Sequence, residues 1–181
     1  LIKKTRERLV THSLYKGKAF RVQMETQVQD FVSKITMSNP EFIDVNFMPA
    51  ELMLNRDTLD LLNAALWTPI ERTDQTRYFG VSLKRGVLLQ GPYGTGKSLT
   101  ALATAKKAQQ NGWTFIYLKD VRDLKRIYPF AARYAPSVIF GEDIDLVVKH
   151  GNDDNEDGIN MLNNALDGVD SKDKDIILVL T

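Results

Sequence analysis

Cysteine is absent from this sequence, histidine occurs only twice, and no apolar run is long enough to cross a bilayer. Without cysteine the chain can form neither a disulfide nor a thiolate metal site, which is typical of a cytoplasmic protein. His12 and His150 have no metal-ligating neighbour at a familiar spacing, so we interpret both as surface residues. The formal net charge is only +1, which gives no general reason to expect a nucleic acid or a membrane as partner.

Both ends of the sequence look cut. The chain begins without methionine and stops within residues 176–181, an apolar run that predicts a buried strand. We therefore expect a piece of a longer protein, and the length suits one domain or slightly more. No signal-peptide core follows the first residues, and the sequence shows no internal repeat.

The region before residue 50 differs in composition from the rest. It holds a basic cluster opposed only by Glu7: Lys3, Lys4, Arg6, Arg8, Lys16, Lys18 and Arg21. The cluster could bind an anionic partner such as nucleic acid, or it could form the solvated face of a small N-terminal α+β region; we favour the solvated face. Alternation over residues 19–24 predicts a strand, and the remainder of residues 1–49 predicts no definite fold.

Strands and helices are expected to alternate over residues 50–181. The predicted strands are 86–90, 113–118, 137–140 and 176–180. The predicted helices are 58–67, 98–108, 121–134 and 156–166. The first is capped by Asn55 or Asp57 and ended by Pro69, and the second is stopped by Asn111-Gly112. The third is capped by Asp120 and is expected to be kinked or split at Pro129. Residues 74–76 are expected to be a polar loop. This alternation predicts an α/β fold with a mostly parallel sheet covered by helices on both faces.

The most informative stretch is residues 91–98, Gly-Pro-Tyr-Gly-Thr-Gly-Lys-Ser, which fits the P-loop pattern G-x-x-x-x-G-K-[ST]. Glycines accept positive φ and leave room for a phosphate, and the helix that follows directs its positive end at the same place. Lys97 is expected to reach the outer phosphates and the Ser98 hydroxyl to ligate Mg²⁺. A chance match is expected in about a per cent or less of chains this long.

A pair of acids supplies the expected second half of the site. Glu142 and Asp143 directly follow the predicted strand 137–140, where ligands bind in open α/β sheets. One acid would hold Mg²⁺ and the other would orient the attacking water. A second acidic stretch, residues 151–158, lacks the ligand spacing of a calcium loop, so we interpret it as a solvated loop.

Residues from about 52 to 181 resemble the nucleotide-binding half of an ATPase of the AAA family, within the wider AAA+ group. The matching blocks are, in chain order, residues 80–90, the P-loop with Pro92, residues 135–140 with the two acids, and residues 162–169. The resemblance implies a P-loop NTPase fold of three αβα layers. It divides the chain into an N-terminal region, 1–49, and a nucleotide-binding subdomain, 50–181, truncated before its helical lid.

The resemblance also implies roles for individual residues. Binding of ATP or ADP would involve Gly91, Pro92, Tyr93, Gly94, Thr95, Gly96, Lys97 and Ser98, with Leu99, Gly80 and the linker near Leu54-Asn55 beside the adenine. Ser98 and Glu142 would hold Mg²⁺. Lys97, Glu142 and Asp143 would be the catalytic residues, with Asp143 in the position that activates water. The family usually forms six-membered rings that use ATP hydrolysis to remodel a protein or another macromolecule.

Four departures from the family pattern matter: the order of the acids, the substrate-gripping loop, the sensor residue, and the arginine finger with the lid. The family usually has Asp followed by Glu, whereas this chain has Glu142 followed by Asp143. Aspartate is shorter by a methylene, and a displacement of about an ångström can cost roughly 10²-fold in rate, so slow hydrolysis is expected. The aromatic-glycine pair of the substrate-gripping loop is missing after residue 118, and the sensor residue, arginine finger and lid would lie beyond Thr181. The sequence thus supports an ATPase or, alternatively, a nucleotide-gated assembly switch that hydrolyses little ATP.

Overall fold

The computed structural model describes residues 13–29, 32–46, 52–144 and 174–181. Several predicted features lie outside these residues: the first four residues of the basic cluster, both histidines, the acidic loop 151–158, the helix 156–166 and the family block 162–169. In the part of the chain that the structure describes, no helix is long and apolar enough to cross a membrane.

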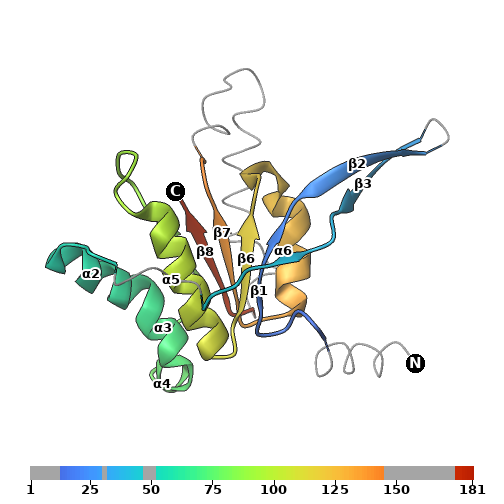
Figure 1. The fold of residues 1–181 in the computed structure, drawn as a ribbon. Helices are drawn as coiled ribbons and strands as arrows, with labels where there is room; N and C mark the ends of the chain where they lie inside the picture. The colour runs from blue at the N-terminus through green and yellow to red at the C-terminus, as the bar shows by residue number, and fades with distance from the viewer. Residues whose placement is uncertain (1–12, 30–31, 47–51, 145–173) are drawn as a thin grey trace, which may run out of the picture.

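The centre of the fold is a six-stranded sheet in the order β4-β1-β6-β7-β8-β5 (Figure 1). Neighbouring strands run parallel except for β4, which is antiparallel to β1. The strands are β1 (Ala19–Val22), β4 (Glu41–Phe42), β5 (Arg85–Leu88), β6 (Thr114–Leu118), β7 (Ser137–Gly141) and β8 (Ile176–Leu180). The predicted strands are confirmed, and β7 and β8 are buried along their whole length because both faces of the sheet are covered.

Helices cover the two faces of this sheet, which confirms the predicted three-layer α/β fold (Figure 1). On one face, α5 (Lys97–Gln110) lies against the sheet and buries its alanines with Trp113, Phe115 and Phe140. On the other face, α6 (Leu124–Arg133) buries Leu124, Ile127 and Ala131 against Ile116 and Ile139. Asn111 and Gly112, at φ +74°, end α5 as predicted.

Strands from the N-terminal region extend this same sheet. The predicted strand over residues 19–24 is confirmed as β1, which pairs with β6, and β4 pairs with the outer side of β1. Between them, β2 (Met24–Gln29) and β3 (Val32–Met37) form a hairpin that projects from the sheet (Figure 1). The boundary near residue 49 remains a prediction, and strands from both sides of it belong to one sheet.

The helical segment before β5 is longer than predicted. Asn55 caps α2 (Arg56–Leu62) as expected, accepting a hydrogen bond from the Thr58 backbone N–H at 2.7 Å. Helical turns then continue through a π-helical stretch (Asn63–Trp67), α3 (Thr68–Glu71) and α4 (Thr73–Tyr78). The predictions of an end at Pro69 and a loop at 74–76 were wrong. Pro69 lies in the first turn of α3, and the helical turns continue past it.

The break in the next helical segment is also displaced. A 3₁₀ turn (Val121–Asp123), capped by the Asp120 side chain, precedes α6, which begins at Leu124. The segment therefore changes from 3₁₀ to α-helix between Asp123 and Leu124, whereas the predicted change was at Pro129, which lies inside α6. A proline removes a single intrahelical hydrogen bond, and the apolar face packed on the sheet holds the short helix together.

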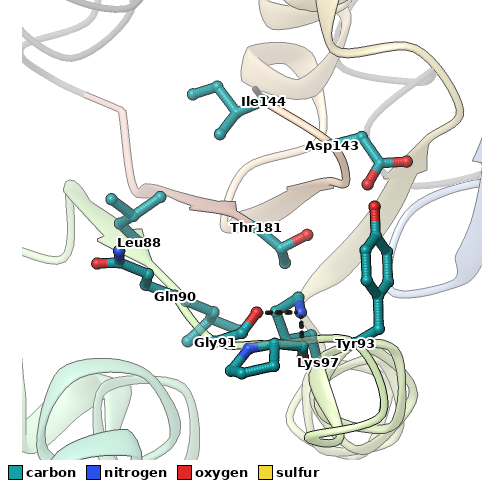
Figure 2. Close-up of a pocket in the computed structure, with 10 residues that line it drawn as sticks. Leu88, Gln90, Gly91, Tyr93, Lys97, Asp143, Ile144 and Thr181 are labelled. Atoms are coloured by element: carbon teal, nitrogen blue, oxygen red, sulfur yellow. Dashed lines mark hydrogen bonds between the residues drawn. The ribbon is translucent and has the colours of Figure 1, made fainter. Parts of the chain in front are cut away.

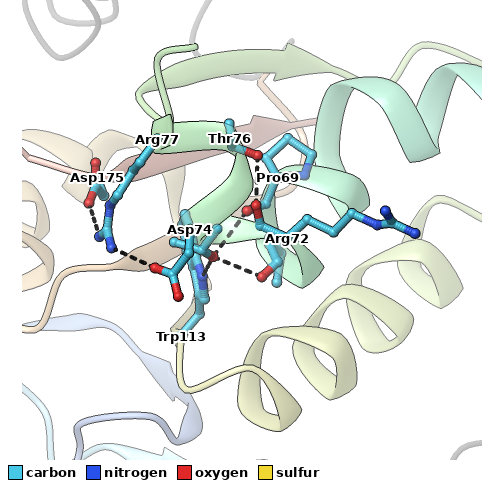
Figure 3. Close-up of polar contacts among 9 residues, drawn as sticks. Pro69, Arg72, Asp74, Thr76, Arg77, Trp113 and Asp175 are labelled. Atoms are coloured by element: carbon cyan, nitrogen blue, oxygen red, sulfur yellow. Dashed lines mark hydrogen bonds and ion pairs between the residues drawn. The ribbon is translucent and has the colours of Figure 1, made fainter. Parts of the chain in front are cut away.

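Polar contacts join α3 and α4 to the residues that directly precede β6 and β8 (Figure 3). The Trp113 indole N–H donates to Thr73 Oγ1 at 2.8 Å, and the Thr73 hydroxyl lies 2.9 Å from the Ile70 carbonyl oxygen. Arg77 pairs with Asp175 at 2.5 Å and with Asp74 at 3.5 Å. Because Asp175 lies just before β8, the Arg77–Asp175 pair ties α4 to the start of that strand.

A buried hydrogen bond between α5 and the π-helical stretch gives a test of this packing. The Trp67 indole N–H donates to Thr104 Oγ1 at 2.9 Å, and Thr104 is fully buried. Thr104→Val leaves that N–H without a partner, so we expect the free energy of unfolding to fall by about 1–3 kcal/mol. Denaturant unfolding measures the change. Thr76→Val on exposed α4 is the matched control, expected within about 0.5 kcal/mol of the parent; equal losses in the two variants would contradict the prediction.

Candidate functional site

A cavity of about 400 Å³ opens at the carboxyl edge of the parallel sheet (Figure 2). The loop after β5, the residues after β7 and the end of β8 meet there. The lining residues are Leu88, Leu89, Gln90, Gly91, Pro92, Tyr93, Lys97, Asp143, Ile144 and Thr181. The cavity therefore lies where open α/β sheets bind ligands, and the P-loop forms one of its walls.

The P-loop joins β5 directly to α5 and has the backbone that the pattern requires. Gly94 and Gly96 have φ of +80° and +94°, a region that residues with a Cβ rarely adopt. Gly91 has no positive φ, but a Cβ there would lie 2.9 Å from Thr95 Oγ1. The Thr95 hydroxyl itself donates to the Pro92 carbonyl at 2.8 Å, which closes the loop on itself.

Lys97, the first residue of α5, extends back over the loop. Its ammonium donates to the carbonyl oxygens of Gly91 at 2.7 Å and Pro92 at 3.0 Å (Figure 2). It also lies 5.7 Å from the centre of the Tyr93 ring. The positive charge is thereby held at the cavity wall, beside the amino end of a 14-residue helix, and both features favour an anion.

The two acids after β7 occupy different surroundings. Asp143 is exposed, lines the cavity and has a φ of +57°. Figure 2 shows its carboxylate on the opposite side of the cavity from Gly91, with the Tyr93 ring directed toward it. Glu142 is half-buried and does not line the cavity; its Oε2 accepts a hydrogen bond from the Tyr117 hydroxyl at 2.7 Å.

The surroundings of this hydrogen bond affect the pKa of Tyr117 and leave one oxygen of Glu142 without a hydrogen-bond partner among the described residues. Burial raises the pKa of Tyr117, and the hydrogen bond to Glu142 raises it further, so the phenol is a proton donor at all ordinary pH values. The second carboxylate oxygen, Glu142 Oε1, is buried and has no hydrogen-bond partner among the described residues. A buried carboxylate oxygen without a partner fits a ligand that is a cation or a water bound to one.

The remaining predicted residues do not line the cavity. Ser98 and Leu99 are exposed in the first turn of α5. Leu52 and Leu54 lie against Gly96, each with a methyl 3.9 Å from where a Cβ would be. Gly80, at φ +68°, ends α4: its N–H donates to Arg77, and Val81 N–H donates to Thr76. The adenine contacts expected of Leu99 and Gly80 remain predictions.

Sequence reasoning missed five residues that line the cavity: Leu88, Leu89, Gln90, Ile144 and Thr181. Thr181 directly follows β8, and its backbone N–H donates to the Gly141 carbonyl at 3.1 Å. A polar residue immediately after a buried parallel strand was the available signal, because strand ends share one edge of the sheet. Gln90 lies between the end of β5 and the P-loop, and nothing in the sequence around it indicated that it would line the cavity.

The donors present suit magnesium bound together with phosphates. No group of three or more histidine or carboxylate ligands exists in the described part of the chain. Mg²⁺ commonly uses only one or two protein oxygens and completes its shell with phosphate and water. The Ser98 hydroxyl and the Glu142 carboxylate could provide such oxygens, whereas zinc would need a fuller set of nitrogen or sulfur ligands.

Comparison with known proteins agrees with this geometry. Residues 87–181 match the ATPase family associated with various cellular activities (AAA), which is just over half of the 181 residues. The chain belongs to the AAA family. The match includes the P-loop, β6, β7 with both acids, and β8, so the cavity of this AAA chain falls largely within it.

Individual relatives come from two groups of proteins. A protein of Mus musculus named nuclear valosin-containing protein-like is 28% identical over 177 residues, covering 86% of this chain and 20% of the relative. ATP-dependent zinc metalloproteases FtsH are 35% identical in Thermotoga maritima and 34% in Helicobacter felis, covering 56% and 59% of this chain. The chain thus spans about a fifth of the length of these curated relatives.

The close approach of Gly91 to Thr95 gives a test of the P-loop geometry. We expect Gly91→Ala to weaken ATP binding roughly tenfold, because the added methyl meets Thr95 Oγ1 and the loop must move. In a Thr95→Ala background the nearest remaining Thr95 atom, Cβ, would be 3.7 Å away, so the same substitution should cost much less. Calorimetric titration of all four proteins measures the coupling. An equal loss in both backgrounds would contradict this account.

Proposed function

We propose that this AAA chain is an ATPase module that binds ATP with Mg²⁺ and hydrolyses it to ADP and phosphate, coupled to remodelling of a macromolecule. The observation that carries the proposal is the cavity itself. Lys97, at the start of α5, and Asp143, after β7, line one space at the carboxyl edge of the sheet. A fixed cation beside the phosphate-binding loop and a carboxylate that can orient water are two of the parts that phosphoryl transfer to water uses.

Each residue has a defined part in this proposal. The backbone N–H groups of the P-loop residues other than Pro92, together with the Lys97 ammonium, hold the phosphates and stabilise the charge that develops on them. The Ser98 hydroxyl and Glu142 hold Mg²⁺, which when bound neutralises phosphate charge. Asp143, the acid that lines the cavity, orients the attacking water and accepts its proton. The polar Thr181 side chain would contact the same water or the terminal phosphate.

Association with further copies of the chain belongs to the same proposal. Several large apolar side chains around α2 and α4 are exposed: Met53, Leu61, Tyr78 and Phe79. Apolar groups of this size often mark an interface between proteins. We propose that they face a neighbouring subunit in a homo-oligomer, with a six-membered ring as the family suggests. The family resemblance implies that ATP in such a ring lies between subunits, and a nucleic-acid partner is not favoured.

Two substitutions test the assignment of Lys97 and Asp143. Lys97→Ala should weaken ATP binding at least tenfold, because the loop loses its only side-chain cation at the cavity wall. Asp143→Asn should retain ATP binding and lower turnover by about 10²–10⁴-fold, the usual contribution of a general base. Calorimetry and phosphate release measure the two effects. Lys106→Ala, on the same helix, is the control; turnover unchanged in both site variants would refute the proposal.

A nucleotide-gated assembly switch is the second candidate function. It is favoured by the acids, because Glu142 is bound by Tyr117 and the acid in the cavity is the shorter aspartate. Such a module would bind ATP tightly and change its oligomeric state while hydrolysing almost none. Binding, turnover and sedimentation measured on one sample of the assembled protein separate the two functions. Tight binding with no phosphate release would establish the switch and exclude the ATPase.

A further inference from the structure

Tyr117 is held in one orientation beside the metal-side acid. It lies on β6 directly opposite Phe140 of β7, and the two rings stack with centres 6.4 Å apart and planes within 7°. Glu142 is two residues beyond Phe140, so it leaves the strand on the same face of the sheet. The Tyr117 hydroxyl therefore meets the Glu142 carboxylate, and donates to Oε2 at 2.7 Å.

This contact divides the two oxygens of Glu142. Oε2 is occupied by the phenol, while Oε1 is buried and has no hydrogen-bond partner among the described residues. Glutamate has one more rotatable bond than aspartate, so an unrestrained Glu142 would lose more freedom on binding a cation. A hydrogen bond to one oxygen fixes the carboxylate and leaves the other oxygen for a ligand.

We propose that Tyr117 is a positioning residue: it orients Glu142 so that Oε1 alone faces Mg²⁺ or a water in its shell. This inference rests on the proposed function of the site and adds a residue to it. It also gives the reversed order of the acids a physical basis. Glu142, in the metal-side position, is restrained by the Tyr117 hydroxyl. An aspartate there is shorter by a methylene and would not reach that hydroxyl in the same geometry.

The N-terminal strand takes part in this arrangement. Arg21 on β1 lies opposite Tyr117 in the sheet, and its guanidinium carbon is 5.7 Å from the centre of the tyrosine ring. Arg21, Tyr117 and Phe140 thus form a row across three neighbouring strands. The ring of Tyr117 is enclosed between a cation on one side and an aromatic ring on the other, which favours the single orientation seen here.

The test is Tyr117→Phe, which removes only the hydroxyl. ATP affinity is measured by calorimetry with excess EDTA and with Mg²⁺, and phosphate release is followed over a range of Mg²⁺ concentrations. We expect affinity in EDTA within twofold of the parent, because the phosphate contacts remain. The gain in affinity on adding Mg²⁺ should fall roughly tenfold, as for loss of a hydrogen bond to a charged group, and half-maximal turnover should need correspondingly more Mg²⁺.

Two further variants make the result specific. Tyr134→Phe is the matched control, because Tyr134 lies before β7, at the opposite edge of the sheet, among the rings of Tyr15 and Phe130; its Mg²⁺ dependence should equal that of the parent. Glu142→Gln should itself lose the Mg²⁺ effect, and adding Tyr117→Phe to it should change nothing more.

The outcomes separate this inference from the function beneath it. A parent protein that binds no ATP would overturn the proposed function. A parent that binds ATP, together with a Tyr117→Phe variant whose Mg²⁺ dependence is unchanged, would overturn the role of Tyr117 alone. Equal losses from Tyr117→Phe in the parent and in the Glu142→Gln background would also overturn it, because the effect would then not pass through the carboxylate.

Discussion

Parallel pairing of the strands is the constraint on which the site depends. One row of hydrogen-bonded neighbours crosses the sheet at its carboxyl edge: Leu88, Leu180, Gly141 and Leu118. Thr181 and Glu142 directly follow residues of this row, and the P-loop begins three residues beyond Leu88. A slip of one residue in any strand would turn its side chains to the opposite face. Burial of β7 and β8 along their whole length opposes such a slip, so the core fixes the positions of the proposed catalytic groups.

Close packing at the end of the row fixes the acids more finely. A Cβ on Gly141 would lie 3.3 Å from Leu180 Cδ2 and 3.4 Å from Val121 Cγ2, so a side chain at this position would press on both neighbours. Glycine lets β7 run to its end between β6 and β8 without displacement. Glu142 then follows two residues beyond Phe140, the partner of Tyr117, and Asp143 after it lines the cavity. The packing around Gly141 therefore positions both Glu142, which accepts a hydrogen bond from Tyr117, and the exposed Asp143.

How much the sequence reveals depends on whether the determining contacts are local. The strands, α5 and the P-loop could be predicted, because buried apolar runs, alanines and glycines act within a few residues. The end of the helical segment at Pro69 was predicted wrongly, because Ile70 and Trp67 are buried against α5 and hold the following turns helical. The pairing of Tyr117 with Glu142 could not be predicted, since it depends on the register of two strands and not on either motif.

The reversed order of the acids can be understood from the backbone. Asp143 has a φ of +57°, the left-handed region, and it is the one non-glycine residue with positive φ in the described ranges. Aspartate and asparagine tolerate this conformation better than longer side chains do, because a short polar side chain can bond locally. A glutamate at this position would meet a backbone penalty that aspartate largely avoids. The shorter acid therefore suits the turn into the cavity, and the longer acid suits the preceding position, where Tyr117 restrains it. Exchanging the pair would put glutamate at the positive-φ position and would take away the longer carboxylate that Tyr117 reaches, so each acid fits its own surroundings better than the other acid would.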